Sequence, residues 1–164
     1  DLGSVTDKVI QLRDTTGFPG MKVLQFAFDP EGDSIEMPHN HPNNVVAYTG
    51  THDNDTILGW YENETTPASR AFLDKYSNRR DDETVHHALF RLLFGSPAFM
   101  AVVTMQDLLG LDGSARMNLP NTLGGNWTWR MTVDQLTPEI EAELLDLTET
   151  YRRVNVHLVN EKSE

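Results

Sequence analysis

The chain has 164 residues, of which 38% are hydrophobic and 23% are charged, and these proportions fit one globular domain with a real core. The net charge of −12 argues against nucleic acid as a partner, because phosphate binding needs clustered Lys and Arg. No apolar run approaches the roughly 20 residues that cross a bilayer. The sequence has no cysteine, which excludes disulfides and fits the cytoplasmic location that we expect.

The first elements are a short helix, a strand, a long loop and a second strand. Thr6 is a candidate helix cap and Gly17 a candidate helix end. The apolar run Met21–Phe28 predicts a buried strand, and the polar segment 29–44, rich in Pro, Gly and Asn, predicts a loop. Val45–Tyr48 predicts a second strand, covered on both faces.

Helices then alternate with a third strand. Residues 56–61 predict a turn of helix, Pro67–Tyr76 predicts a second helix, and 83–94 predict a third with apolar side chains on one face. Phe99–Met105 predicts a third buried strand. Strands separated by helices indicate parallel pairing through right-handed crossovers.

The last third of the chain is an irregular segment followed by a helix. Glycines and asparagines interrupt residues 111–129. Thr137 and Pro138 open a long helix, and Arg152 and Arg153 are expected further along it. The expected apolar stripe of this helix consists of Ile140, Leu144, Leu147, Tyr151, Val154 and Leu158.

Polar residues follow the predicted strands directly. His52 and Asp53 come after the second strand and Asp107 after the third. Ligands of α/β folds bind at this carboxyl edge of the sheet, so we interpret Asp53 as the functional centre. From the local pattern, it is an equally good interpretation that Asp53 caps the next helix.

The pattern of polar residues favours a sugar ligand over a metal. His39, His41 and His52 could bind zinc, but their spacing lacks the usual helical arrangement, and the segment from Asp53 onward fails the calcium-loop pattern; we therefore expect no metal and no cofactor. Asp, Asn and His pair with sugar hydroxyls, and tryptophans such as Trp127 and Trp129 can stack on sugar rings. Packing at the core or rim is at least as good an interpretation for one of these two tryptophans, and the sequence assigns no definite role to His41, Trp127 or Trp129.

Several motifs, which cover nearly the whole chain, resemble the bacterial 4-alpha-glucanotransferases, also called amylomaltases or disproportionating enzymes, of the alpha-amylase clan. The motifs are Gly20-Met21-Lys22-Val23-Leu24-Gln25-Phe26, Thr49-Gly50-Thr51-His52-Asp53-Asn54-Asp55-Thr56, Gln106-Asp107-Leu108-Leu109-Gly110, Ala115-Arg116-Met117-Asn118 and Gly125-Asn126-Trp127. They occur in the order of the family.

The resemblance implies an α/β fold, the C-terminal portion of a (β/α)8 TIM barrel. The three strands would be its sixth to eighth, and residues 1–164 a single fragment of a catalytic barrel that needs about 250 residues. The family transfers alpha-1,4-glucan segments between maltooligosaccharides by a retaining double displacement. Its nucleophile and acid/base would lie upstream of Asp1, so the missing N-terminal barrel portion is an expected partner, and the isolated chain is expected to be inactive.

By the same resemblance, Asp53 matches the family's third acid, which stabilises the transition state. His52 would bind the same sugar, and Asn118 matches a sugar-contacting position. His39 and Asn40 lie in a loop that we expect to face the same cleft.

Two further questions stay open at this point. The chain could instead be a non-catalytic sugar-binding or structural module. Three strands with two open edges also predict self-association, or rearrangement into an open three-layer α/β sandwich.

Overall fold

The structure, a computed structural model, describes residues 5–154. Its centre is a sheet of three parallel strands in the order β1 (Gly20–Val23), β2 (Val45–Tyr48) and β3 (Met100–Val102). Gly20 pairs with Val45, and Tyr48 pairs with Val102. The connection from β1 to β2 contains only 3-10 turns, Leu24–Phe26 and Pro38–Asn40, whereas helices fill the connection from β2 to β3.

The helices begin where the sequence places cap residues. Thr56, Thr66 and Thr84 each accept a hydrogen bond from the backbone N–H three residues further on, which satisfies a donor that the first turn leaves free. The helices are α1 (Asp7–Thr16), α2 (Ile57–Asn63), α3 (Pro67–Ser77), α4 (Val85–Phe94), α5 (Met105–Leu108) and α6 (Pro138–Thr150).

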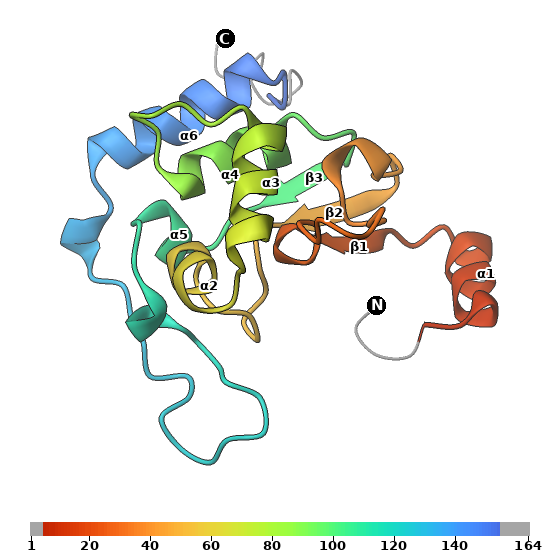
Figure 1. The fold of residues 1–164 in the computed structure, drawn as a ribbon, viewed down its shortest axis with the longest axis horizontal. Helices are drawn as coiled ribbons and strands as arrows, with labels where there is room; N and C mark the ends of the chain where they lie inside the picture. Colours follow the sequence, from red (N-terminus) through yellow and green to blue (C-terminus); the bar gives the residue numbers. More distant parts are fainter. Residues whose placement is uncertain (1–4, 155–164) are drawn as a thin grey trace, which may run out of the picture.

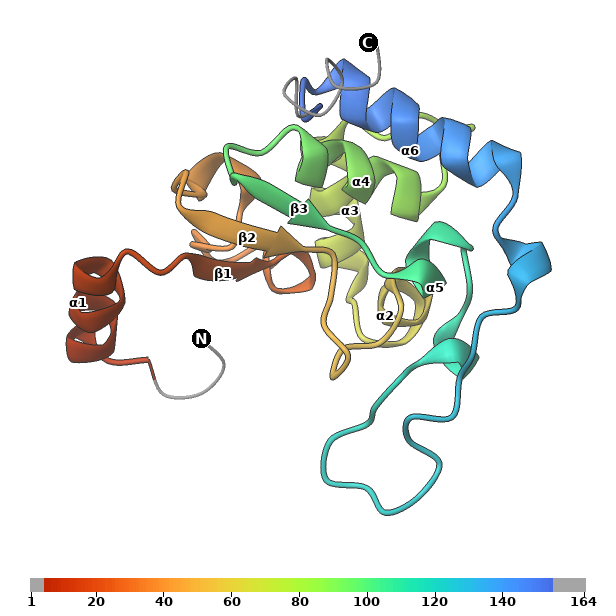
Figure 2. The same ribbon diagram turned by 180° about the vertical axis from the view of Figure 1, so that it is seen from behind.

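Helices α3 and α4 lie on one face of the sheet, and its other face is open (Figures 1 and 2). Val45 and Ala47 of β2 are buried under these helices, whereas Val46 and Tyr48 on the opposite face are half-buried. The prediction that β2 is covered on both faces is therefore wrong for one face. Helices on one face alone also differ from a three-layer sandwich and match a segment of a barrel wall.

Two strands are shorter than their apolar runs predict. β1 ends at Val23 because a 3-10 turn follows at once, and Leu24, Ala27 and Phe28 of the remaining run are buried in the core, whereas Phe26 is exposed. β3 ends at Val102 because Thr104 caps α5 by accepting a hydrogen bond from the Asp107 backbone N–H. An apolar run reports burial, and burial does not distinguish a strand from a turn.

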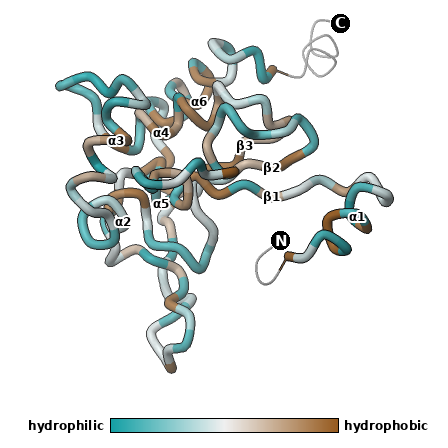
Figure 3. The backbone as a smooth tube through the Cα atoms, turned by 45° about the vertical axis from the view of Figure 1, so that its right-hand side comes forward, coloured by the Kyte–Doolittle hydropathy of each residue, from teal (hydrophilic) through white to brown (hydrophobic). Residues whose placement is uncertain are grey.

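The β3 edge of the sheet is partly exposed. Met100 of β3 is 47% exposed and the other two residues of the strand are half-buried, which corrects the prediction of a buried third strand. Beyond β1, helix α1 stands apart from the body and has no buried residue (Figure 1). Figure 3 shows the apolar residues of α1 in brown, on a helix that lies away from the other elements. The exposed apolar side chains at this end are Val5, Val9, Ile10, Leu12 and Phe18.

The C-terminal helix is shorter than its apolar stripe predicts. α6 ends at Thr150, and its stripe packs Leu144 and Leu147 on the core. Arg152 and Arg153 follow the helix instead of lying on it, and Leu158 lies outside the described residues. In the described part of the chain, no helix has the length and apolar character that would let it cross a membrane.

Candidate active site

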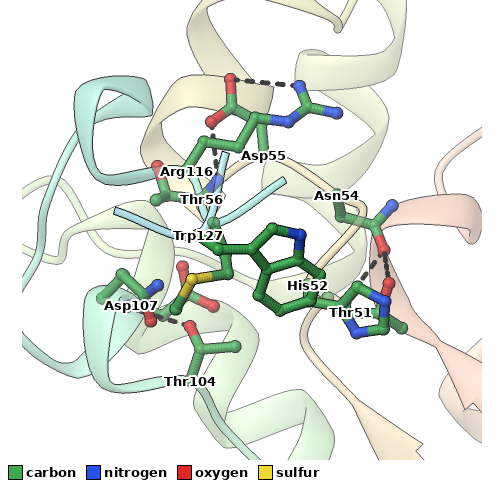
Figure 4. A pocket seen from close by; sticks show the side chains of 12 residues that line it. Thr51, His52, Asn54, Asp55, Thr56, Thr104, Asp107, Arg116 and Trp127 are labelled. Carbon is green, nitrogen blue, oxygen red and sulfur yellow. Dashed lines mark hydrogen bonds and ion pairs between the residues drawn. The ribbon is translucent and has the colours of Figure 1, made fainter. Parts of the chain in front are cut away.

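A cavity of about 200 Å³ opens at the carboxyl ends of β2 and β3 (Figure 4). Three segments line it: the loop of residues 50–56 after β2, the start of α5, and the irregular segment that carries Arg116 and Trp127. Because the strands are parallel, loops far apart in sequence meet at this one edge.

Asp53 does not itself line this cavity, but it lies between His52 and Asn54, which do. Its Oδ1 atom accepts a hydrogen bond from Asn118 Nδ2 at 2.6 Å, and its side chain is 39% exposed. The Nε2 atom of His52 lies 3.4 Å from the same oxygen. A carboxylate, an amide and an imidazole therefore converge on one exposed point, where they could bind vicinal hydroxyls.

An aromatic side chain adds an apolar surface to this polar group. The rings of His52 and Trp127 are 5.1 Å apart, and Trp127 lines the cavity while 52% of it stays exposed. Trp127 has a left-handed backbone with φ of 62°, and its N–H donates to the carbonyl of Met117 at 2.7 Å. The half-buried Trp129 does not line this cavity.

The loop that carries Asp53 is held by its own polar side chains. Asn54 Oδ1 accepts from both the backbone N–H and the hydroxyl of Thr51, each at 2.9 Å. The Thr51 hydroxyl in turn accepts from the backbone N–H of Asp53 at 3.2 Å. These local bonds fix the backbone that aims the Asp53 side chain.

Arg116 ties this loop to the irregular segment. It donates from Nη2 to the carbonyl of Asp53 at 2.7 Å and from Nε to the carbonyl of Asn118 at 3.0 Å. Nη1 donates to Glu64 Oε1 at 3.1 Å and lies 3.9 Å from Asp55 Oδ2. One guanidinium thus joins the backbones of the two residues whose side chains bond to each other.

A second carboxylate, Asp107, belongs to the lining of the cavity. It is 2% exposed, and it accepts hydrogen bonds from the hydroxyl of Thr49 and from the backbone N–H of Ile57, both at 2.7 Å. Burial raises the pKa of Asp107, and these hydrogen bonds oppose the rise.

The comparisons with known proteins agree with this geometry. The family model described as 4-alpha-glucanotransferase matches residues 1–136. The chain belongs to this family. The 4-alpha-glucanotransferase of Streptococcus pneumoniae is 62% identical over 99% of the chain, and the chloroplastic/amyloplastic enzyme of Solanum tuberosum is 42% identical over 94%.

A solved structure extends the family match to the fold. The amylomaltase of Streptococcus agalactiae, in complex with acarbose, has a TM-score of 0.90 and 42% identity over 94% of the chain. This confirms the predicted fold class, in which three parallel strands and flanking helices form part of a larger barrel. The chain spans 31% of that structure, 32% of the S. pneumoniae relative and 27% of the S. tuberosum relative.

The geometry excludes one of the two interpretations of Asp53. The cap of α2 is Thr56, whose hydroxyl accepts from the backbone N–H of Gly59 at 3.1 Å. The interpretation of Asp53 as a helix cap is therefore wrong. The structure does bring the expected set of His52, Asp53 and Asn118 together.

The long loop of residues 29–44, which we expected to face this cleft, does not contribute to it. His39 Nδ1 lies 2.9 Å from the hydroxyl of Tyr76, in a separate cavity that Pro97, before β3, also lines. Asn40 donates to Asp33 Oδ1 and to the carbonyl of Ser34 within its own loop. The loop folds toward the amino end of the sheet, which local sequence does not reveal.

The three histidines considered as zinc ligands lie apart. His41 is buried and its Nε2 lies 2.9 Å from the carbonyl of Glu36, while His39 and His52 lie at different cavities. Burial lowers the pKa of His41. Within residues 5–154, no three His, Asp or Glu side chains are grouped as a metal site would need.

Sequence reasoning missed how Arg116 and Asp107 act. Both stand in motifs that resemble the family, and Asp107 follows a strand end, but neither position says what the side chain touches. The partners of Arg116 are 52 and 63 residues away in sequence, and those of Asp107 are 50 and 58 away. Only the folded chain reveals these contacts.

Proposed function

We propose that this chain supplies part of the active site of a 4-alpha-glucanotransferase, which transfers alpha-1,4-glucan segments between maltooligosaccharides. The observation that carries the proposal is the convergence of Asp53, His52 and Asn118 beside a cavity at the carboxyl ends of parallel strands. Carboxylate, amide and imidazole groups suit sugar hydroxyls, and the Trp127 ring suits the apolar face of a sugar.

In this proposal Asp53 stabilises the transition state. Retaining transfer uses one carboxylate as nucleophile and a second carboxyl group as acid/base, through a covalent glycosyl-enzyme. In our proposal both come from the portion of the protein that this chain does not span. Hydrogen bonds that the Asp53 carboxylate accepts from sugar hydroxyls would strengthen as positive charge develops on the sugar ring, and Asn118 and His52 orient this carboxylate.

The remaining portion of the protein is the first partner in this proposal. Three surfaces of the chain would pack against this portion: the open face of the sheet, the partly exposed strand β3 and the exposed apolar side chains of α1. In its absence, these surfaces would drive self-association of the chain. The proposal includes no cofactor and no nucleic acid, and it places the protein in the cytoplasm.

A full-length chimera tests the role of Asp53. In it, this chain replaces the matching 162 residues of the S. pneumoniae relative. The variant Asp53→Asn keeps the shape of the side chain but removes its charge, and we expect it to lower the rate of maltooligosaccharide disproportionation by at least about 100-fold. Asp82→Asn is the matched control, because the Asp82 side chain is 90% exposed.

The assay separates the proposal from the alternative of a non-catalytic module. If the chimera transfers glucan and Asp53→Asn retains that activity, Asp53 is not the transition-state group. If the folded chimera binds maltooligosaccharide in calorimetry but never transfers it, the binding module is favoured.

A further inference from the structure

Asp107 contacts both ends of the loop that carries Asp53. Its Oδ2 atom accepts from the Thr49 hydroxyl at 2.7 Å, directly after β2 ends, and its Oδ1 atom accepts from the backbone N–H of Ile57 at 2.7 Å, where α2 begins. The loop of residues 50–56 between these two points carries His52 and Asp53.

The carboxylate that makes these contacts is deeply buried. Asp107 is 2% exposed and Thr49 is 0% exposed, so water does not compete for the bonds. The charged group that acts most on Asp107 is Asp55, which repels it. A buried carboxylate without a cationic partner is costly, so its two acceptor oxygens are matched here to two fixed donors.

We propose that Asp107 is a positioning residue for Asp53, because it fixes both ends of the loop of residues 50–56 to α5. This inference rests on the proposed function, and it concerns a buried residue of the cavity lining whose two carboxylate oxygens are already bonded to protein donors. α5 itself is fixed, since the Thr104 hydroxyl accepts from the Asp107 backbone N–H at 3.2 Å.

Two further side chains hold the loop between its ends. Arg116 donates to the carbonyl of Asp53, and Gln25 Nε2 donates to the carbonyl of Asp55 at 2.8 Å. Each of these bonds holds one carbonyl oxygen, whereas Asp107 holds the two ends at once. If the ends move, the 2.6 Å bond between Asp53 and Asn118 is lost, and a displacement of about 1 Å in a catalytic group can cost about 100-fold in rate.

The test compares Asp107→Asn and Thr49→Val in the full-length chimera. Asn keeps an acceptor for the Ile57 N–H but replaces the second oxygen with a donor, and Val removes only the Thr49 hydroxyl. We expect each variant to lower kcat by about 10- to 100-fold while KM stays within about 2-fold, because Asp53 acts in the transition state. Amide hydrogen exchange in residues 50–57 should become faster in both.

Glu83→Gln is the matched control for a general loss of stability. The Glu83 side chain is 3% exposed and is bonded to Arg91 Nε at 2.6 Å, remote from the cavity. We expect this variant to melt at a lower temperature while kcat and exchange in residues 50–57 stay unchanged.

The kinetic measurements and the amide hydrogen exchange test the proposed function and the positioning role of Asp107 separately. Unchanged kcat and unchanged exchange in Thr49→Val would overturn the positioning role, and so would a rise in KM alone. If the unsubstituted chimera shows no transfer at all, the proposed function fails, and the exchange of residues 50–57 in the variants still decides whether Asp107 holds the loop. If Asp107→Asn does not fold, Thr49→Val decides.

Discussion

Arg116 joins the two segments that form the candidate site. Its side chain is 20% exposed, and its three nitrogen atoms donate to the carbonyls of Asp53 and Asn118 and to the carboxylate of Glu64. A guanidinium can make these bonds in three directions at once, because its donors are arranged in a rigid plane. The backbone on which Asp53 and Asn118 stand therefore depends on this one side chain.

Replacement of Arg116 by Lys tests this dependence. A single ammonium group cannot reach the three acceptors in the same geometry, so we expect kcat of the chimera to fall by about 10- to 100-fold. Arg130→Lys is the control, because Arg130 also donates to two carbonyls, those of Trp127 and Trp129, but remains exposed. Equal kcat values for the two variants would contradict the role of Arg116.

The sequence predicts which polar residues form the candidate site better than it predicts which atoms they contact. His52, Asp53 and Asn118 are predicted as one group because they stand in motifs and after a strand, and the structure brings them together. His39 and Asn40 are in a polar loop with similar chemistry, yet this loop folds to the other end of the sheet. The direction of a long loop depends on tertiary contacts, such as that of His39 with Tyr76, which the local pattern does not contain.

Helix α2 carries a glycine for a reason that lies outside the helix. A Cβ atom at Gly59 would lie 2.5 Å from Asp55 Oδ2, and one at Gly113 would lie 2.9 Å from the same oxygen. The two glycines leave room for the Asp55 carboxylate, which is 10% exposed and bonds to the backbone N–H of Thr56 at 2.8 Å.

This packing predicts that Gly59→Ala destabilises the protein when Asp55 is present but not when Asp55 is replaced by Ala. Alanine normally stabilises a helix by about 1 kcal/mol relative to glycine, but Gly59→Ala should destabilise the chimera by about 1–3 kcal/mol because its methyl group meets Asp55. In the Asp55→Ala background the same substitution should be neutral or stabilising. Denaturant unfolding measures both values, and a stabilising Gly59→Ala in the unsubstituted protein would contradict the packing.

The elements themselves are predicted well in order and type but less well in length. Helices with threonine caps, such as α4, match because the local signal and the core agree. β1 is shorter than predicted because a 3-10 turn begins at Leu24, and β3 is shorter because Thr104 starts a helix inside an apolar run. Tertiary packing decides these boundaries.

The whole molecule should lose stability as the pH falls below neutrality. Burial lowers the pKa of His86 to about 4, and burial also lowers the pKa of His41. In the unfolded chain both titrate near about 6.5. Between about pH 4 and 6.5 the unfolded chain therefore binds more protons than the folded one, and the free energy of unfolding decreases with falling pH.

A comparison of variants isolates the contribution of His86. We expect the free energy of unfolding of the chimera to fall by about 2 kcal/mol more than that of His86→Gln between pH 7 and pH 4. An identical pH dependence in His86→Gln would refute the assignment.

Two surfaces of the described part of the chain are left uncovered. Helices cover one face of the sheet, the other face is open, and α1 has no buried residue (Figures 1 and 2). The family resemblance predicts a barrel segment, whereas the strand pattern alone does not distinguish it from a three-layer sandwich. In sedimentation we expect the isolated chain to self-associate, and a monodisperse monomer would contradict this expectation.

In our proposal, Asp53 completes an active site whose other carboxyl groups come from the rest of the protein. Glucan transfer should therefore be measured with this chain alone, and then with the chain mixed with the remaining two thirds of the S. pneumoniae relative. We expect transfer only in the mixture, and we expect it to be lost when the chain carries Asp53→Asn. Transfer by the chain alone, or an assembled mixture that stays inactive, would contradict the proposal.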